Sequence, residues 1–217
     1  IRSWVASQLE TEEQRKGGWT SGEGNSAQTS HQRRFEAYNR CKNHGVRIAM
    51  NVKLRSPEQM AKMRSAGRMA AEVRELIGEY VGPGVTTEEL DRICHEHIVN
   101  IQKAIPACLG YRGFPKSVCT SVNQVVCHGI PSEQQVLKSG DIINIDVTVI
   151  KDGWYGDTSK RFRVGKVASH ADRLIKRAQE CLYKGIELVR PGVRLGDIGH
   201  AIQTHAEASY YSVVRDY

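Results

Sequence analysis

Two aspartates, Asp146 and Asp157, flank a turn signal in the segment DIINIDVTVIKDGWYGDTSKRF. The Asp-Gly pair at 152–153, between β-branched runs, predicts a two-residue hairpin turn. In that register Asp146 lies opposite Ser159 and Asp157 lies opposite Thr148. The two carboxylates then become diagonal neighbours on one face, with Cβ atoms within roughly 8 Å. A slip of one residue would move one of them to the wrong face.

The apolar surroundings of these carboxylates limit the chemistry that they could do. Two carboxylates that converge among Ile and Val side chains repel each other and lose hydration, so without a cation one should take up a proton. With a divalent metal ion both stay charged and act as oxygen ligands. In the structural alternative, Asp157 caps the turn and Asp146 accepts hydrogen bonds from backbone amides. The spacing alone leaves both interpretations open.

His128 is a second candidate for chemistry. It follows the valine pair at 125–126 and precedes Gly-Ile-Pro at 129–131, so the backbone is expected to turn directly after it. The imidazole would then be exposed at the end of a strand, where it could donate to a substrate carbonyl or amide. The alternative is a structural histidine with local hydrogen bonds.

The composition excludes several classes of protein. The 217 residues are 40% hydrophobic, and no apolar run reaches the roughly 18 residues of a membrane span. The first residues contain no signal-peptide core, so we expect a cytoplasmic protein. The net charge of +7 allows contact with RNA or ribosomes, but no RNA-binding motif is present, so no specific nucleic acid is expected as a partner.

The six cysteines are scattered and form no CxxC pair, which favours reduced thiols over a disulfide framework. A zinc site at Cys94, His95, His97 and Cys108 would need a spacing that matches no common zinc motif.

Capping signals predict where the helices begin. Ser56, Pro57 and Gln59 form an N-cap, a first-turn proline and a capping-box partner, and Thr86 and Glu89 repeat the box. Helical stripes of apolar residues follow, at Met60, Met63, Ala70, Val73 and Ile77, then at Leu90, Ile93, His97, Ile98 and Ile101, and after Ser169 at Leu174, Ile175, Ala178 and Leu182.

Between these helices, residues 118–164 contain three β-branched runs, VVCHGIP, DIINIDVTVI and RFRVG, which predict strands. Helices, strands and then helices predict an α+β domain over residues 50–217. Residues 1–49 are rich in Gly, Ser and Gln without apolar periodicity, and we expect a flexible or disordered extension there.

The domain contains an internal repeat. VGPGVTTEEL at 81–90 recurs as VRPGVRLGDI at 189–198, and the helices on both sides of each segment are in phase. This pattern predicts a duplicated unit with a pseudo-two-fold axis. At the same offset Tyr217 corresponds to Leu109, so the sequence stops where the strands of the second copy should begin.

Two blocks, CLGYRGFPKSVCTSVNQVVCHGIP and DIINIDVTVIKDGWYGDTSKRF, resemble the central blocks of the type I methionine aminopeptidases. The similarity runs from about Asn51 to Tyr217. It implies the pita-bread fold, an α+β domain with a curved antiparallel sheet. Residues 50–217 would be the N-terminal two-thirds of that catalytic domain, C-terminally truncated, with the second half incomplete.

The resemblance also implies roles for single residues. Asp146 would bind one of two divalent metal ions (Co, Mn, Fe, Zn or Ni) and Asp157 would bridge both. His128 would act in catalysis and contact the substrate near the scissile amide. Backbone carbonyls of Asn123 and Val125 would hold a monovalent cation. The methionine pocket would be lined by Cys108, Tyr111, Phe114 and Cys119, which with His128 would bind the substrate. The family has Tyr at the position of Phe114 and His at that of Arg112.

The activity that the resemblance implies is hydrolytic removal of the initiator methionine from peptides and nascent proteins, by a monomer without a membrane partner and with a ribosome contact left open. In the family a CGHGIG block, HEEP and two glutamate-bearing strands supply further metal ligands, and this sequence contains none of them. We therefore expect residues 1–217 alone to be inactive. The alternatives are a proline-specific aminopeptidase or prolidase, and a non-catalytic binding protein with the same fold.

Overall fold

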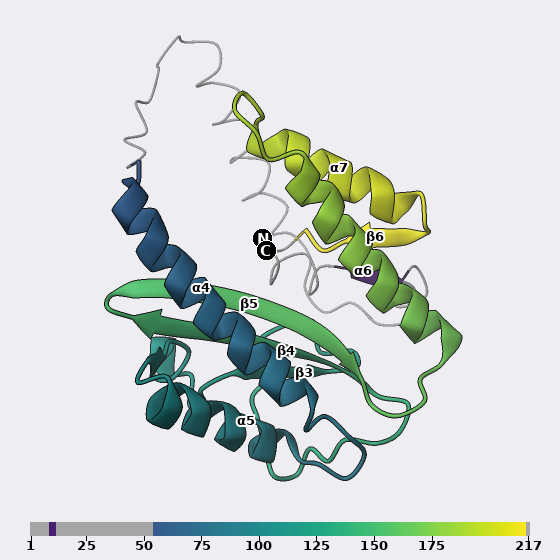
Figure 1. Cartoon of the computed structure of the whole chain (residues 1–217). Coiled ribbons are helices and arrows are strands. Elements are labelled where there is room, and N and C mark those ends of the chain that lie inside the picture. The colour runs from purple at the N-terminus through teal and green to yellow at the C-terminus, as the bar shows by residue number, and fades with distance from the viewer. Residues whose placement is uncertain (1–8, 12–53, 216–217) are drawn as a thin grey trace, which may run out of the picture.

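The computed structural model describes residues 9–11 and 54–215, which form an α+β structure (Figure 1). In chain order its elements are β1 (Leu9–Thr11), α4 (Pro57–Gly78), α5 (Thr87–Glu96), the π-helical turn η1 (His97–Ile101), β2 (Ile105–Pro106), the 3-10 turn η2 (Tyr111–Gly113), β3 (Cys119–Val122), β4 (Ile142–Lys151), β5 (Trp154–Arg163), α6 (Ser169–Glu187), α7 (Leu195–Glu207) and β6 (Tyr211–Val213).

Both predicted caps start helices, although only the first capping box is complete. The Ser56 hydroxyl accepts from the backbone N–H of Gln59, and the Gln59 side chain accepts from the backbone N–H of Ser56. At α5 the Thr86 hydroxyl accepts from the backbone N–H of Glu89. Glu89 itself pairs with Arg92 at 2.6 Å instead of reaching back to the cap.

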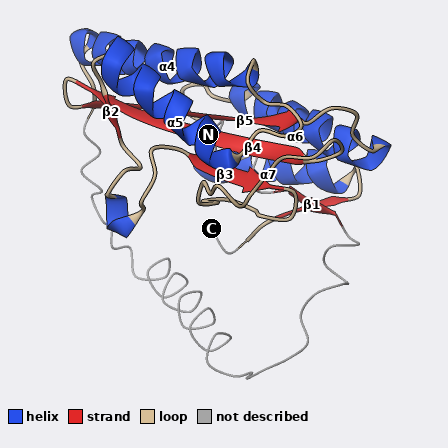
Figure 2. Cartoon of the chain, turned by 90° about the horizontal axis from the view of Figure 1, so that it is seen from below, coloured by secondary structure: helices blue, strands red, loops and turns tan. Residues whose placement is uncertain are grey.

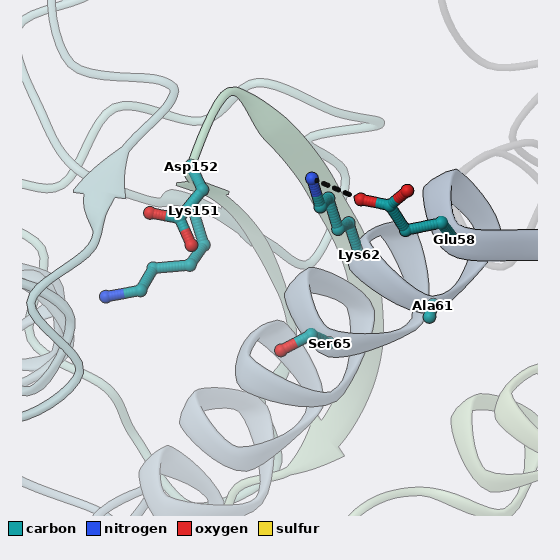
Figure 3. Close-up of a pocket in the computed structure, with 6 residues that line it drawn as sticks. All are labelled: Glu58, Ala61, Lys62, Ser65, Lys151 and Asp152. Carbon is teal, nitrogen blue, oxygen red and sulfur yellow. Dashed lines mark ion pairs between the residues drawn. The ribbon is translucent and has the colours of Figure 1, made fainter.

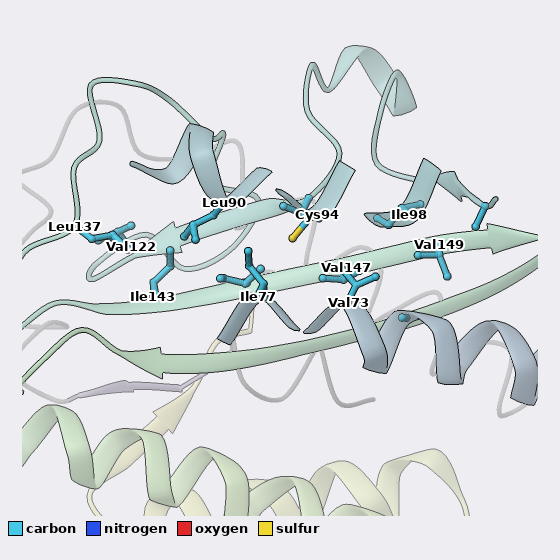
Figure 4. Close-up of a cluster of buried hydrophobic side chains, with 14 of the residues drawn as sticks. Val73, Ile77, Leu90, Cys94, Ile98, Val122, Leu137, Ile143, Val147 and Val149 are labelled. Carbon is cyan, nitrogen blue, oxygen red and sulfur yellow. The ribbon is translucent and has the colours of Figure 1, made fainter. Parts of the chain in front are cut away.

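The sheet is built around β4. It pairs with β5 along its whole length on one edge and with β2 and β3 on the other, always antiparallel. Its alternate residues Ile143, Ile145, Val147 and Val149 are fully buried. They pack in one cluster with apolar side chains of α4 and α5 (Figure 4). Burying such a side chain stabilises the fold by about 1.5–3 kcal/mol.

The two helices α4 and α5 lie together along one side of the sheet (Figure 2). Helix α4 approaches β5 closely at Gly156, where a Cβ would stand 2.1 Å from the Ala66 carbonyl oxygen. Only a glycine fits at this point. The Arg74 side chain adds a 3.1 Å hydrogen bond from Nη1 to Thr158 Oγ1. These contacts hold β5 from one side. Helix α4 therefore leaves the opposite face of the hairpin uncovered.

A second apolar cluster joins α6, α7 and β6, and Ile142 at the start of β4 packs in it. The turns that lead into α5 and α7 confirm the internal repeat. Gly84 and Gly192 have φ of 91° and 90°, and Val85 N donates to Gly82 O as Val193 N donates to Arg190 O.

Some expectations about single elements were wrong. Met60 and Met63 are 47% and 43% exposed because the start of α4 presents Ala61, Lys62 and Ser65 to the hairpin tip instead. Ile101 at the end of η1 is 70% exposed. The run Val125–Pro131 forms a loop instead of a strand. It contains His128 in the left-handed region at φ 55°, which breaks extended backbone.

Most of residues 1–49, for which we predict an extension, lie outside the described residues. Within them Leu9–Thr11 pairs antiparallel with β6. No helix in residues 54–215 is both long enough and apolar enough to cross a membrane.

Candidate metal and substrate site

The hairpin β4–β5 has the register that the sequence predicts. Asp152 and Gly153 have φ of 50° and 78°, which suits a two-residue turn with positive φ at both central positions. Asp146 pairs with Ser159 and Thr148 pairs with Asp157. The two aspartates therefore lie diagonally on the face of the hairpin turned away from α4, with Asp146 half-buried and Asp157 exposed.

Strand β3 adds a cysteine to this face, because Cys119 pairs with Asp146 across β3 and β4. Strand β2 pairs with the same edge of β4, nearer to the C-terminal end of β4 than β3 does. Ala107 N donates to Thr148 O at 2.9 Å, so Cys108 leaves the sheet next to the point where Cys119 enters it. Cys119 is 5% exposed and Cys108 is half-buried.

The two thiols lie close enough for each to shift the pKa of the other. A hydrogen bond from the Cys119 thiol lowers the pKa of Cys108; burial and the charges of Asp146 and Asp157 act against this, and a hydrogen bond with Thr148 assists it. The same thiol contact, together with burial, raises the pKa of Cys119 far above its ordinary value. Cys108, Cys119 and the two aspartates thus belong to one neighbourhood.

His128 reaches this region from the 125–131 loop. Thr120 N donates to Gly129 O at 2.8 Å, and Gly129 N donates to Ser121 Oγ at 3.2 Å. A Cβ on Gly129 would lie 2.1 Å from the Thr120 carbonyl oxygen, so glycine is required there. This anchoring holds the preceding His128 beside the start of β3, exposed, in a left-handed conformation of the kind that clusters at functional sites.

The other predicted pocket residues lie in the connection between β2 and β3. Tyr111 is 64% exposed, with the Arg112 guanidinium 5.5 Å from its ring centroid. Phe114 ends the η2 turn and is half-buried. Their place between Cys108 and Cys119 is compatible with a pocket wall, and their role stays a prediction.

The turn at Asn123 and Val125, predicted to bind a monovalent cation through backbone carbonyls, is fixed to the start of β4. Asn123 N donates to Ile142 O at 2.9 Å, its Oδ1 accepts from Ile142 N at 3.0 Å, and its Nδ2 donates to Asp141 Oδ1 at 2.9 Å. Val125 N donates to Val122 O at 3.1 Å. These bonds make the turn rigid, and the cation remains a prediction.

The sequence analysis did not identify three residues on or beside the face that carries Asp146 and Asp157. Thr148 contributes to the lowered pKa of Cys108. The Sγ of Cys127 lies 3.7 Å from Nδ1 of His128. Arg161 lies opposite Asn144, and its Nε is buried without a hydrogen-bond partner among the described residues. The alternation of the hairpin that exposes Asp146 and Asp157 also identifies Thr148 and Arg161 as members of their face.

The donor chemistry fits a divalent cation in part. Carboxylates are the oxygen ligands that hard divalent ions take, and Asp146 and Asp157 supply two of them from a rigid hairpin. Among residues 54–215 no three His, Cys, Asp or Glu side chains converge closely enough to hold an ion by themselves. The described residues therefore supply part of a ligand set.

A hollow of about 350 Å³ lies elsewhere, where the start of α4 meets the tip of the hairpin (Figure 3). Its lining includes the ion pair of Lys62 with Glu58 at 3.1 Å. Lys151, also in the lining, donates to the carbonyl oxygens of Gln102 and Lys103. None of the predicted site residues lines it, so this hollow is separate from the candidate site.

Comparison with known proteins identifies the class. Residues 61–217 match the model of metallopeptidase family M24, and the chain belongs to this family. It is similar to the methionine aminopeptidase of Escherichia coli strain K12, with 58% identity over 168 residues, 77% of this chain and 64% of the relative. The chain thus spans slightly less than two-thirds of the length of that relative.

Solved structures agree with this assignment. The methionine aminopeptidase of Rickettsia prowazekii superimposes with a TM-score of 0.75 at 56% identity, covering 76% of this chain and 66% of that one. The enzyme of Thermotoga maritima gives 0.74 at 34% identity, with the same two coverages. The pita-bread fold predicted from the sequence is confirmed.

Proposed function

We propose that the protein to which these residues belong removes the N-terminal methionine from peptides and nascent proteins by metal-dependent hydrolysis. The observation that carries this proposal is the register of β4 and β5, which sets Asp146 and Asp157 diagonally on one face beside Cys108 and Cys119. The 58% identity to a methionine aminopeptidase supports the choice of substrate.

Asp146 and Asp157 would hold two divalent ions together with further ligands, and their oxygen donors accept Co, Mn, Fe, Zn or Ni. Such ions, when bound, polarise a carbonyl group and lower the pKa of water. The family assigns the remaining ligands to a histidine and two glutamates. Because two carboxylates offer too few donors, residues 1–217 alone should bind metal weakly and turn over little substrate.

The other residues would position the substrate. His128 would donate a hydrogen bond near the scissile amide. Cys108, Cys119 and Phe114 would form an apolar wall with polarisable sulfur, which suits an unbranched thioether, and Tyr111 would flank it. Carbonyls of Asn123 and Val125 would bind a monovalent cation that stiffens the turn before the 125–131 loop. We further propose a cytoplasmic enzyme that acts as a monomer on peptide and nascent-protein N-termini, with a ribosome contact left open.

The test uses an extended fusion, in which this chain is followed by the remaining C-terminal part of the E. coli methionine aminopeptidase. Hydrolysis of Met-Ala-Ser and of an Ala-Pro peptide is measured with Co²⁺ or Mn²⁺, for the fusion and for residues 1–217. We expect the fusion to cleave Met-Ala-Ser and leave Ala-Pro intact, and residues 1–217 to be nearly inactive. A preference for Ala-Pro would identify a proline-specific enzyme. A fusion that binds metal without cleaving either peptide would indicate a binding protein.

A further inference from the structure

Strand β6 is the counterpart, in the second copy of the internal repeat, of strand β2 in the first. At the offset that relates the two Pro-Gly-Val turns, Ile105 of β2 corresponds to Val213 of β6. In both copies a residue with positive φ leads from the preceding helical segment into the strand, Lys103 at 49° and Tyr210 at 62°. The two strands therefore occupy the same place in the repeated unit.

The helices of the second copy fix β6 through its side chains. Tyr211 is 6% exposed and belongs to the apolar cluster of α6 and α7, and Val213 packs against the same cluster. Figure 1 shows β6 beside these two helices. Because its side chains hold the strand in place, the backbone edge of β6 is ready to pair with another strand.

The strand that pairs with this edge comes from a distant part of the sequence. Strand β1 pairs antiparallel with β6 in the register Leu9↔Val213, Glu10↔Ser212 and Thr11↔Tyr211. The sheet of β1 and β6 has only these two strands among the described residues. A pairing of three residues in a two-stranded sheet is marginal by itself.

The first copy has a more extensive partner at the corresponding strand. Strand β2 pairs antiparallel with the end of β4, at Val149 and Ile150. Strand β4 also pairs with β3 and, along its whole length, with β5, and one of its faces is buried under α4 and α5. At the offset of the repeat, the counterpart of this β4 segment falls after residue 217. The E. coli relative contains more than the matched region, since the match covers 64% of its length.

We propose that the edge of β6 is a docking site for the second-copy counterpart of β4, and that Leu9–Thr11 holds this edge only until that strand is supplied. The exchange replaces one set of backbone hydrogen bonds by an equivalent set, so the strand with more neighbours wins. Strand β1 contributes three residues, whereas a counterpart of β4 brings a hairpin partner and a buried face with it. Until the exchange, β1 protects β6 from pairing with another chain. The inference concerns the fold and does not rest on the proposed peptidase activity.

An engineered disulfide tests whether Leu9–Thr11 holds the edge. In the double variant Glu10→Cys/Ser212→Cys the new thiols stand on directly opposed residues, whose Cα atoms lie about 4.5–5.5 Å apart in an antiparallel pair, within the range of a disulfide. The 217-residue chain is purified under reduction, oxidised mildly, alkylated and digested with trypsin. We expect mass spectrometry to find residues 3–15 joined to residues 195–215, two peptides that contain no native cysteine.

The matched control is Glu10→Cys/Thr204→Cys. Thr204 lies on the same tryptic peptide as Ser212, but it is exposed on α7 and pairs with no strand. We expect little cross-link in this variant. A cross-link in Glu10→Cys/Ser212→Cys that is no stronger than in the control would show that Leu9–Thr11 does not hold β6, and would overturn the proposal.

The extended fusion tests the displacement. When the C-terminal part of the E. coli methionine aminopeptidase follows residue 217, the cross-link of Glu10→Cys/Ser212→Cys should fall to the level of the control, because the second-copy strand then holds β6. A second fusion, with the corresponding part of the R. prowazekii enzyme, repeats the measurement with an independent partner. Cross-linking in both fusions as strong as in the 217-residue chain would refute the displacement. The readout is the bond alone, so a failure of the proposed function is measured separately, by peptide hydrolysis.

Discussion

At the scale of single residues, the relative position of Asp146 and Asp157 depends on the two turn residues between them. Positive φ at Asp152 and Gly153 closes the hairpin in two residues, and the pairing of every later residue follows from that closure. A longer turn would shift one aspartate to the face that packs on α4, where a carboxylate would lose its hydration. The sequence predicts this part of the site because the turn signal is local.

His128 acts on the substrate in our account and does not bind the metal. In the extended fusion, His128→Ala should lower kcat for Met-Ala-Ser by roughly 10²-fold, because a positioned hydrogen-bond donor or acid is lost. Metal content, measured by mass spectrometry of the purified protein, should stay unchanged. His170→Ala is the matched control, since His170 is exposed in the first turn of α6. Equal loss of metal and activity in His128→Ala would refute this division of roles.

Arg161 lies on the site face, and the partial burial of its guanidinium costs stability. Burial lowers the pKa of Arg161, and its Nε has no hydrogen-bond partner in residues 54–215. Replacing a buried, incompletely paired charge by an apolar side chain of similar length is often neutral or stabilising. We therefore expect Arg161→Met to leave the Tm of residues 1–217 unchanged or to raise it. Arg163→Met, which breaks the ion pair with Asp172 at 2.5 Å, should lower it. A clear fall in Tm for Arg161→Met would reveal a partner for the guanidinium.

At the scale of elements, the site depends on how helices hold the hairpin of β4 and β5. Helices α4 and α5 fix one side through the cluster around Ile143 and Val147. On the other side α6 packs on Ile142 and is joined to the end of β5 by the ion pair of Arg163 with Asp172. The hairpin that carries the aspartates is thus held along one face by α4 and α5 and at its open end by α6.

The Arg163–Asp172 link gives a prediction for the pH dependence of stability. Hydrogen bonds with Lys176 and Arg163 lower the pKa of Asp172 below its ordinary 3.8. The stabilisation is therefore present above that ordinary pKa and is lost as the pH falls through the lower pKa of the folded state. Asp172→Asn should lower Tm slightly at pH 7, and the difference from the unaltered chain should shrink towards pH 3. Asp152→Asn, at the exposed hairpin tip, is the control for the same change of side chain elsewhere. A difference that grows on acidification would contradict the assigned sign.

Local signals predict most of these elements, and non-local contacts explain the exceptions. Ser56 and Thr86 start helices because a capping side chain acts within three residues. The 125–131 run was wrongly predicted as a strand, because its shape is set by hydrogen bonds of Gly129 to Thr120 and Ser121. The meeting of Cys108 with Cys119 depends on the two strands that share one edge of β4. The proximity of the two cysteines has no signal within either segment, and within 125–131 the sequence indicates only the turn after His128.

At the scale of the whole molecule, the repeated unit of helix, turn and helix organises the fold. The matching turns at Gly84 and Gly192 lead into α5 and α7 with the same backbone conformation. In the first copy the sheet with Asp146 and Asp157 follows. Membership of family M24 and the structural match to methionine aminopeptidases agree with this duplicated plan. The repeat was visible in the sequence because both copies keep Pro-Gly-Val at one offset.

The central claim is that the Asp146–Asp157 pair holds the catalytic metal of a methionine aminopeptidase. It is tested most directly by measuring bound metal and Met-Ala-Ser hydrolysis together in the extended fusion, for Asp157→Asn and for Asp152→Asn. Both changes convert an exposed aspartate of one hairpin to asparagine, and Asn suits the turn at position 152. We predict that Asp157→Asn loses metal and nearly all activity while Asp152→Asn retains both. Full metal content and unchanged hydrolysis in Asp157→Asn would contradict the account.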